Sequence, residues 1–143
     1  MLQEKQFTKA DETWATPKKL FDELNAEFNF TLDVCALPHN AKLKNFFTPE
    51  IDGLKQDWSR DRCWMNPPYG RIMGVWIKKA YEEAQRGALV VCLIPSRTCT
   101  AYWHDYVMKG EVRFLRGRIK FEGAPGSAPF PSCVVIFRPK GNA

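Results

Sequence analysis

The sequence lacks several features, and each absence argues against a class of protein. Its longest apolar run, residues 88–94, is much shorter than the roughly 20 residues that cross a bilayer, so no membrane span is expected. The first six residues, MLQEKQ, contain no apolar signal-peptide core, and we therefore expect a cytoplasmic protein. The five cysteines include no C-x-x-C pair, so neither a zinc site nor a disulfide framework is indicated.

Repeats, low-complexity tracts and linkers are also missing from the 143 residues, which predicts a single domain with one hydrophobic core. The first 12 residues are polar, and we expect them to be flexible and to precede one domain over 13–140. The formal net charge of +5 favours a polyanionic partner, although many basic proteins bind no nucleic acid.

Hydrophobic spacing predicts alternating helices and strands. Apolar residues recur at helical spacing after residue 17, with Thr16 expected as the N-cap and Pro17 as the first helical residue. The run 88–94 is apolar throughout, as in a parallel strand that helices cover on both faces. An α/β sandwich whose sheet ends in antiparallel strands is therefore expected. Helices are predicted over 17–28, 72–86 and 100–108, with a short one around 40–46, and strands over 30–36, 62–65, 88–94, 112–115, 118–121 and 133–137.

The tetrapeptide Asn66-Pro67-Pro68-Tyr69 directly follows a predicted strand and carries the clearest chemistry. The exocyclic amine of adenine is a poor nucleophile, because its lone pair is delocalised into the ring. An Asn oxygen and a carbonyl beside a rigid proline accept hydrogen bonds from such an amine and draw it towards tetrahedral geometry. A Tyr ring stacks on an extruded base. We therefore assign catalysis to Asn66, Pro67, Pro68 and Tyr69, with no metal, and a surface turn with two prolines is the alternative.

Six short segments, in this order, resemble the phage-type, Dam-like DNA N-6-adenine methyltransferases: residues 14–17, 32–36, 56–58, 64–70, 94–98 and 117–121. The resemblance implies a Rossmann-like class I methyltransferase fold, with a mostly parallel sheet, antiparallel C-terminal strands and no separate target-recognition domain. It also implies S-adenosylmethionine as the cofactor, N6 of a flipped adenine in double-stranded DNA as the acceptor, and a role in phage or prophage DNA modification. A monomer or a homodimer is expected. Sequence preference would then come from the loops 37–60 and 122–131 or from a dimer partner.

Asp33 interrupts an apolar strand, and a buried carboxylate needs a cationic or hydrogen-bond-donating partner. The resemblance implies that this partner is the ammonium group of the cofactor, and an Asp that caps the following turn is the alternative. The resemblance also implies that Thr16 and Pro17 lie close to the cofactor's carboxylate, where a helix N-terminus suits an anion, with Trp14 as a further contact.

The glycine-rich loop that usually follows the first strand of a methyltransferase is missing from residues 35–40, and the phage family shares this departure. Asp57 is expected to hold the adenine of the cofactor, with Trp58 or Trp64 packed against it. An ordinary loop carboxylate and core aromatic rings are the alternative.

Basic residues gather in the C-terminal part of the chain and beside the strand 88–94. Phosphate contacts from such residues give a salt-dependent affinity for DNA without sequence preference. The alternative is a solvated basic surface. The candidate DNA-binding residues are Arg97, Arg113, Arg116, Arg118 and Lys120.

Two other functions remain open on the sequence alone. A protein-glutamine or RNA-base methyltransferase acts on a similarly planar nitrogen, so the same tetrapeptide would serve it, but the missing glycine-rich loop favours DNA over protein. A catalytically inactive DNA-binding relative is the second alternative, and the intact Asn66 argues against it.

Overall fold

A computed structural model describes residues 15–141, so the N-terminal segment 1–12 that we expected to be flexible lies outside the described residues. In the described part of the chain, five strands form one sheet in the order β1-β2-β3-β5-β4. Strands β1, β2 and β3 are mutually parallel, and β5 runs antiparallel to both β3 and β4. Strand β4 therefore points the same way as β1–β3, and β5 alone is reversed. The strands are β1 (Leu32–Asp33), β2 (Arg62–Met65), β3 (Leu89–Pro95), β4 (Glu111–Phe114) and β5 (Ser132–Phe137).

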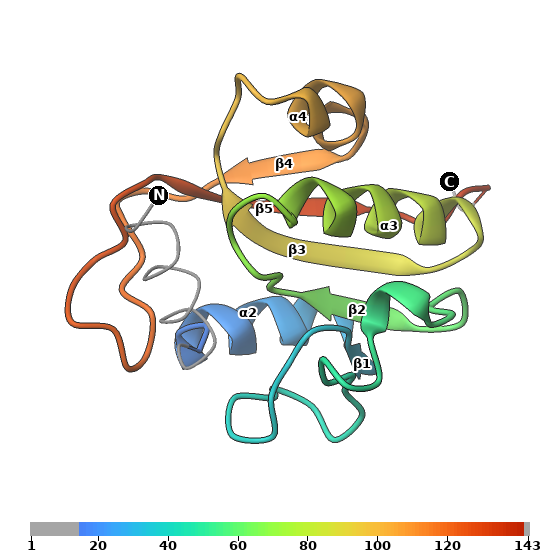
Figure 1. The fold of residues 1–143 in the computed structure, drawn as a ribbon, viewed down its shortest axis with the longest axis horizontal. Helices are drawn as coiled ribbons and strands as arrows, with labels where there is room; N and C mark the ends of the chain where they lie inside the picture. The colour runs from blue at the N-terminus through green and yellow to red at the C-terminus, as the bar shows by residue number, and fades with distance from the viewer. Residues whose placement is uncertain (1–14, 142–143) are drawn as a thin grey trace.

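Helices cover both faces of this sheet (Figure 1). On one face, Trp64 of β2 packs edge-on against Phe21 of α2 (Lys18–Phe28), with 5.3 Å between the ring centroids. Neighbouring strand residues point to the opposite face, where α3 (Met73–Gln85) stacks Trp76 on Trp58 at 6.2 Å. The short helix α4 (Ala101–Asp105) and the 3-10 turns η1 (Gly53–Lys55) and η2 (Val107–Lys109) complete the helical elements of the described residues.

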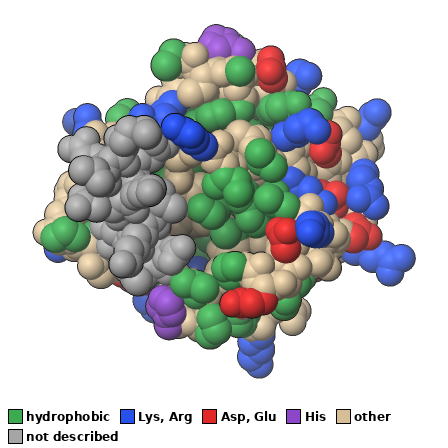
Figure 2. All heavy atoms as spheres, viewed as in Figure 1, with side chains coloured by type: hydrophobic (Ala, Val, Ile, Leu, Met, Phe, Trp, Pro, Cys, Tyr) green, Lys and Arg blue, Asp and Glu red, His purple; other side chains and the backbone are tan. Residues whose placement is uncertain are grey.

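The core lies along β3 and β5, in which every residue is buried. This burial explains why the run 88–94 is apolar throughout. On the face drawn in Figure 2, hydrophobic side chains gather near the middle, and acidic and basic side chains are mixed beside them. Basic side chains therefore do not form one continuous positive surface on this face.

The predicted helices 17–28 and 72–86 are confirmed as α2 and α3, and the region 100–108 forms α4 followed by η2. The predicted strand 30–36 is wrong in length, because only Leu32 and Asp33 pair with β2. The predicted helix 40–46 is wrong. This segment is extended at its end, where Asp33 N–H donates to Asn45 and Phe47 N–H donates to Asp33, both at 3.0 Å.

The predicted strand 118–121 is also wrong, since this segment belongs to the loop 115–131 that joins β4 to β5. Ile119 and Phe121 are buried while the residues between and beside them are exposed, and this alternation resembles a strand. It arises instead because the loop inserts two side chains into the core, while Glu122 pairs with Ala15 as an isolated bridge.

One edge of the sheet collects the functional loops. Strands β1–β4 end at this edge and β5 begins there, and the loop 115–131 extends from it at the left of Figure 1. The segments after β1, β2 and β3 therefore meet the loop 115–131 at this carboxyl edge, which is where open α/β sheets bind ligands. Among residues 15–141, each helix is too short or too polar to cross a membrane.

Candidate active site

A pocket of about 340 Å³ lies at the carboxyl edge. It is formed by the residues before α2, the loops after β1 and β2, and Phe121. All four residues of the predicted catalytic tetrapeptide lie in its wall, together with Thr16 and Asp33. The lining residues are Ala15, Thr16, Asp33, Cys35, Ala36, Leu37, Asn40, Lys42, Pro49, Glu50, Trp64, Asn66, Pro67, Pro68, Tyr69 and Phe121.

The side chain of Asn66 is held at both ends of its amide. Its Nδ2 donates to Thr16 Oγ1 at 3.1 Å, and Tyr69 Oη donates to Asn66 Oδ1 at 3.3 Å. Thr16 is only 2% exposed, so this contact forms inside the protein. A carbonyl oxygen has two lone pairs, and Asn66 Oδ1 can therefore accept a second hydrogen bond from a group in the pocket.

The ring of Tyr69 is supported by two other aromatic rings from the loop 115–131. Phe121 and Phe130 meet it edge-on, with ring centroids 6.1 and 5.5 Å away. The guanidinium of Arg97 lies over the ring of Phe130, 5.5 Å from the ring centroid. Edge-to-face packing of this kind fixes the ring orientation beyond what burial alone achieves. Phe130 belongs to the loop 122–131, from which a contribution to sequence preference was expected, whereas the supporting role of Phe121 was not anticipated.

Asp33 is buried at the end of β1 and lines the pocket. Its carboxylate accepts hydrogen bonds from the backbone N–H of Lys42 at 3.0 Å and of Cys35 at 3.4 Å. Burial raises the pKa of Asp33 to about 7, and the two N–H donors oppose only part of that rise. Asp33 therefore does cap the following turn. The Lys42 ammonium also lowers the pKa of Asp33, but less than the two N–H donors do.

Lys42 is a pocket residue that the sequence analysis missed. Its side chain is 16% exposed, and Nζ lies 3.6 Å from Glu122 Oε1 in the loop 115–131. Asp33 and Lys42 thus place one acid and one base in the same pocket wall. No local motif marks Lys42, because its position depends on the irregular loop 37–60 and on Glu122, which is distant in the sequence.

Thr16 and Pro17 do not cap α2 as predicted. Pro17 occupies the N-cap position, and no side chain of the helix start makes a capping bond. The backbone N–H of Lys18 is instead satisfied by Glu122 Oε2 at 2.9 Å, which leaves the Thr16 hydroxyl for Asn66. Pro17 itself is not a lining residue, and Trp14 lies outside the described residues.

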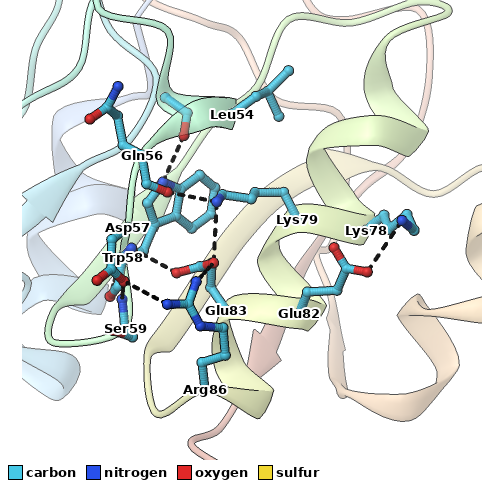
Figure 3. A network of polar contacts seen from close by, with 12 residues as sticks. Leu54, Gln56, Asp57, Trp58, Ser59, Lys78, Lys79, Glu82, Glu83 and Arg86 are labelled. Carbon is cyan, nitrogen blue, oxygen red and sulfur yellow. Dashed lines mark hydrogen bonds and ion pairs between the residues drawn. The ribbon is translucent and has the colours of Figure 1, made fainter.

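Asp57 is not brought to this pocket. It lies beside the C-terminal end of α3, where it accepts a hydrogen bond from Ser59 N–H at 2.8 Å and lies 3.7 Å from Arg86 (Figure 3). The hydrogen bonds from Ser59 lower the pKa of Asp57 below its ordinary value. Trp58 is fully buried near it, while Trp64 does line the pocket.

The candidate DNA-binding residues separate into two groups. Arg113 forms a two-pronged ion pair with Glu27 of α2, at 2.7 and 2.8 Å, and a third contact with Glu111 at 2.8 Å. These carboxylates raise the pKa of Arg113 and occupy its guanidinium, so it holds β4 to α2. The other four candidates form the second group and are exposed at the carboxyl edge. They are Arg97, after β3, and Arg116, Arg118 and Lys120, in the loop 115–131.

These observations define the class: a mixed α/β protein with a pocket at the carboxyl edge of its parallel strands. The pocket is lined by an Asn-Pro-Pro-Tyr loop, by two acidic residues, Asp33 and Glu50, and by one basic residue, Lys42. In the described part of the chain, no group of three or more His, Cys, Asp or Glu side chains is placed to hold a metal ion.

Comparison with known proteins identifies the family. A family model described as DNA N-6-adenine-methyltransferase (Dam) matches residues 3–140. The DNA N-6-adenine-methyltransferase of Haemophilus phage HP1 (strain HP1c1) is 32% identical over 139 residues, which cover 89% of this chain and 79% of that protein. The protein of the same name from Escherichia phage T1 is 29% identical over 94 residues, covering 64% of this chain and 39% of that protein. The chain therefore belongs to the DNA N-6-adenine-methyltransferase (Dam) family, and the family resemblance of the sequence motifs is confirmed.

Proposed function

We propose that this protein transfers a methyl group from S-adenosylmethionine to the N6 amine of a flipped adenine in double-stranded DNA, as an adenine-specific DNA methyltransferase. The observation that carries the proposal is the geometry of Asn66. Its amide is fixed at both ends in the pocket wall, and Oδ1 retains an acceptor lone pair. Membership of the Dam family supports the same substrate and reaction.

The pocket suits the amino-acid end of the cofactor. That end carries an ammonium and a carboxylate, and the wall offers the Asp33 carboxylate and the Lys42 ammonium for them. A cation beside Asp33 would also offset the burial that raises its pKa. When bound, S-adenosylmethionine supplies the electrophilic methyl group.

The protein's own part in the reaction is to bind and activate the amine. Asn66 Oδ1 and the carbonyl beside the rigid prolines accept hydrogen bonds from the amine and draw it towards tetrahedral geometry. Tyr69, supported by Phe121 and Phe130, offers an aromatic surface to the extruded base. The amine loses its proton after the transfer, so no side chain with a specially adjusted pKa is needed.

The strand order supports a Rossmann-like class I assignment. In a doubly wound sheet of order 3-2-1-4-5-6, strands 1, 4 and 5 are adjacent and parallel. Strands β1, β2 and β3 have this relation, and the irregular segment 37–60 stands where strands 2 and 3 would follow strand 1. We propose a compact variant of that fold with one domain over 13–140, acting as a monomer or homodimer on phage or prophage DNA in the bacterial cytoplasm.

The test uses tritiated S-adenosylmethionine with unmethylated DNA, RNA and a release-factor protein in parallel, followed by digestion and identification of the labelled product. Label in N6-methyladenine of DNA supports the proposal. Label in RNA or in a glutamine side chain moves the activity to that substrate. Salt-dependent DNA binding with no transfer from fresh cofactor identifies a binding protein and overturns the proposal.

Asn66→Ala is the decisive variant in that assay. Loss of the acceptor should lower kcat by at least about 100-fold, since one preorganised hydrogen bond in a transition state contributes this much. Cofactor binding, measured by calorimetry, should survive because Asp33 and Lys42 are untouched. Wild-type turnover in Asn66→Ala would refute the catalytic assignment.

A further inference from the structure

The bond between Thr16 and Asn66 links two segments that are far apart in the sequence. Thr16 is almost completely buried immediately before α2, and its Oγ1 receives the hydrogen bond from Asn66 Nδ2. The resemblance suggested Thr16 only as a cofactor contact. The bond to Asn66 places its hydroxyl on the catalytic side chain itself.

The position of Thr16 is fixed from both sides. Its preceding residue, Ala15, exchanges two backbone hydrogen bonds with Glu122, at 3.1 and 2.8 Å. Its following residue, Pro17, is the N-cap of α2, and the helix packs through Phe21 against Trp64 of β2. Thr16 is therefore held between a β-bridge and a packed helix. Because its own position is fixed, its hydroxyl can fix the orientation of a side chain that bonds to it.

The orientation of an Asn side-chain amide has to be fixed by a neighbouring group of this kind. Rotation about its terminal torsion is broad and roughly two-fold, so the backbone alone does not decide whether Oδ1 or Nδ2 faces a ligand. With Nδ2 donating to Thr16, Oδ1 is turned towards Tyr69 Oη and the pocket. An adenine amine has only N–H groups to offer to Asn66, so only the orientation that presents Oδ1 recognises it.

We propose that Thr16 is a positioning residue for catalysis, whose hydroxyl holds the Asn66 amide with Oδ1 towards the N6 amine of the target adenine. This inference rests on the proposed function and assigns it a further residue. Recognition of the amine and the rate of transfer then depend on the Thr16 hydroxyl. The affinity for DNA as a whole, which phosphate contacts dominate, does not.

The variants are Thr16→Val, which keeps the shape but removes the hydroxyl, and Thr16→Ser, which keeps the hydroxyl. Thr31→Val is the matched control. The Thr31 hydroxyl is also hydrogen-bonded, donating to Asp61 and accepting from Arg62 N–H, each at 2.9 Å, but it lies at the opposite edge of the sheet. At saturating cofactor, Thr16→Val should lower kcat about 10–100-fold with KM for DNA within about threefold of wild type. Thr16→Ser should recover most of the rate, and Thr31→Val should retain it.

A binding measurement tests the same idea without turnover. Duplexes carrying either adenine or purine, which lacks the amine, at the methylated position are bound in the presence of S-adenosylhomocysteine. Wild-type protein should prefer the adenine duplex by about 2–10-fold, the range for one neutral hydrogen bond. Thr16→Val should lose that preference while its affinity for the purine duplex is unchanged. Thermal unfolding of each variant establishes that the folded protein is compared.

The possible results distinguish a failure of the proposed function from a failure of the positioning role of Thr16. If wild-type protein methylates no DNA adenine, the proposed function fails before any variant is made. If wild type is active and Thr16→Val keeps both kcat and the adenine preference, the positioning role alone is overturned. A Thr16→Val variant that raises only the cofactor Kd, with kcat unchanged at saturation, identifies Thr16 as a cofactor contact and also overturns it.

Discussion

At the scale of single residues, the proposed contact between the buried carboxylate of Asp33 and the cofactor's ammonium group predicts a defined pH dependence of cofactor binding. The pKa of Asp33 is raised to about 7 in the folded protein, and the ionised form is the one that pairs with an ammonium group. Below pH 7 the carboxylate must first lose its proton, so the affinity for S-adenosylhomocysteine should fall by about tenfold per pH unit. Calorimetry from pH 5.5 to 8.5 tests this, and an Asp33→Ala variant should bind weakly with little change over the same range.

The same carboxylate should affect stability in the opposite sense. A raised pKa means that the folded protein binds this proton more tightly than the unfolded chain. Asp33 therefore supports the fold below about pH 4, and this contribution is lost as the pH rises towards 7. The loss is on the order of 4 kcal/mol at most. Urea unfolding of the cofactor-free protein at pH 5 and 8 should show this dependence, and it should shrink when S-adenosylhomocysteine is bound.

Lys42 gives a prediction that isolates one end of the cofactor. Lys42→Met removes the charge that we assign to the methionine carboxylate, and it should weaken S-adenosylmethionine binding by about 10–100-fold, the range for a charge-assisted hydrogen bond. Decarboxylated S-adenosylmethionine should lose much less affinity, since only the smaller effect of Lys42 on the ionisation of Asp33 is then removed. Lys44→Met is the control, since Lys44 is exposed and does not line the pocket. An equal loss for both ligands would contradict the assignment.

At the scale of elements, Glu83 joins α3 to the segment that precedes β2 (Figure 3). Its buried carboxylate accepts hydrogen bonds from Trp58 N–H at 2.7 Å, from Arg86 at 2.9 Å and from Lys79 at 3.2 Å. Lys79 also donates to Gln56 O at 2.6 Å. Removing the charge leaves a half-buried ammonium without its carboxylate, which is costly.

Glu83→Gln should therefore lower the free energy of unfolding by about 2–4 kcal/mol. Glu82→Gln is a control one residue away. Glu82 pairs with Lys78 at 3.2 Å, but both side chains are more than half exposed, so the loss should be within about 0.5 kcal/mol. Chemical denaturation measures both variants. Equal losses would mean that burial does not strengthen the Glu83 contacts.

The elements that were predicted well from the sequence are those in which one hydrophobic pattern continues over several helical turns or along a whole strand. Helix α3 and strand β3 are of this kind, because each packs along its whole length against the core. The errors at 40–46 and 118–121 have a common cause. Both segments are irregular loops whose conformation depends on distant backbone partners, as Asn45 beside Asp33 and Glu122 beside Ala15 illustrate. Local spacing carries no information about such partners.

At the scale of the whole molecule, the site is assembled where four strands end. The tetrapeptide 66–69 and Asp33 could be selected from the sequence as candidates for one site, because their chemistry is unusual for the elements that carry them, and they do line one pocket. Glu122 could not, although it bonds to the start of α2 through Lys18 N–H and pairs with Lys42 in the pocket wall. Its role arises only when the loop 115–131 meets segments near residues 15 and 42, and an exposed Glu in a loop gives no sign of it.

The placement of cations at this scale predicts how DNA binding responds to salt. Arg116 and Arg118 are exposed in the loop 115–131, whereas Arg113 is bound by Glu27 and Glu111. Each phosphate contact adds about 0.9 to the slope of log K against log salt. Arg116→Ala with Arg118→Ala should therefore lower the magnitude of that slope by about 1.8 and weaken binding to all sequences equally.

Arg113→Ala is the informative comparison, because it also removes an arginine charge, one where the double variant removes two. It should leave the slope unchanged and lower the free energy of unfolding by about 0.5–1 kcal/mol, since its partners are partly exposed. Fluorescence anisotropy with a short duplex at 50–300 mM salt, together with urea unfolding, measures both quantities. A slope that falls by about 0.9 for Arg113→Ala would mean that DNA contacts extend along β4 and displace Glu27. An unchanged slope places the DNA backbone over the carboxyl-edge loop, beside the pocket that holds Asn66.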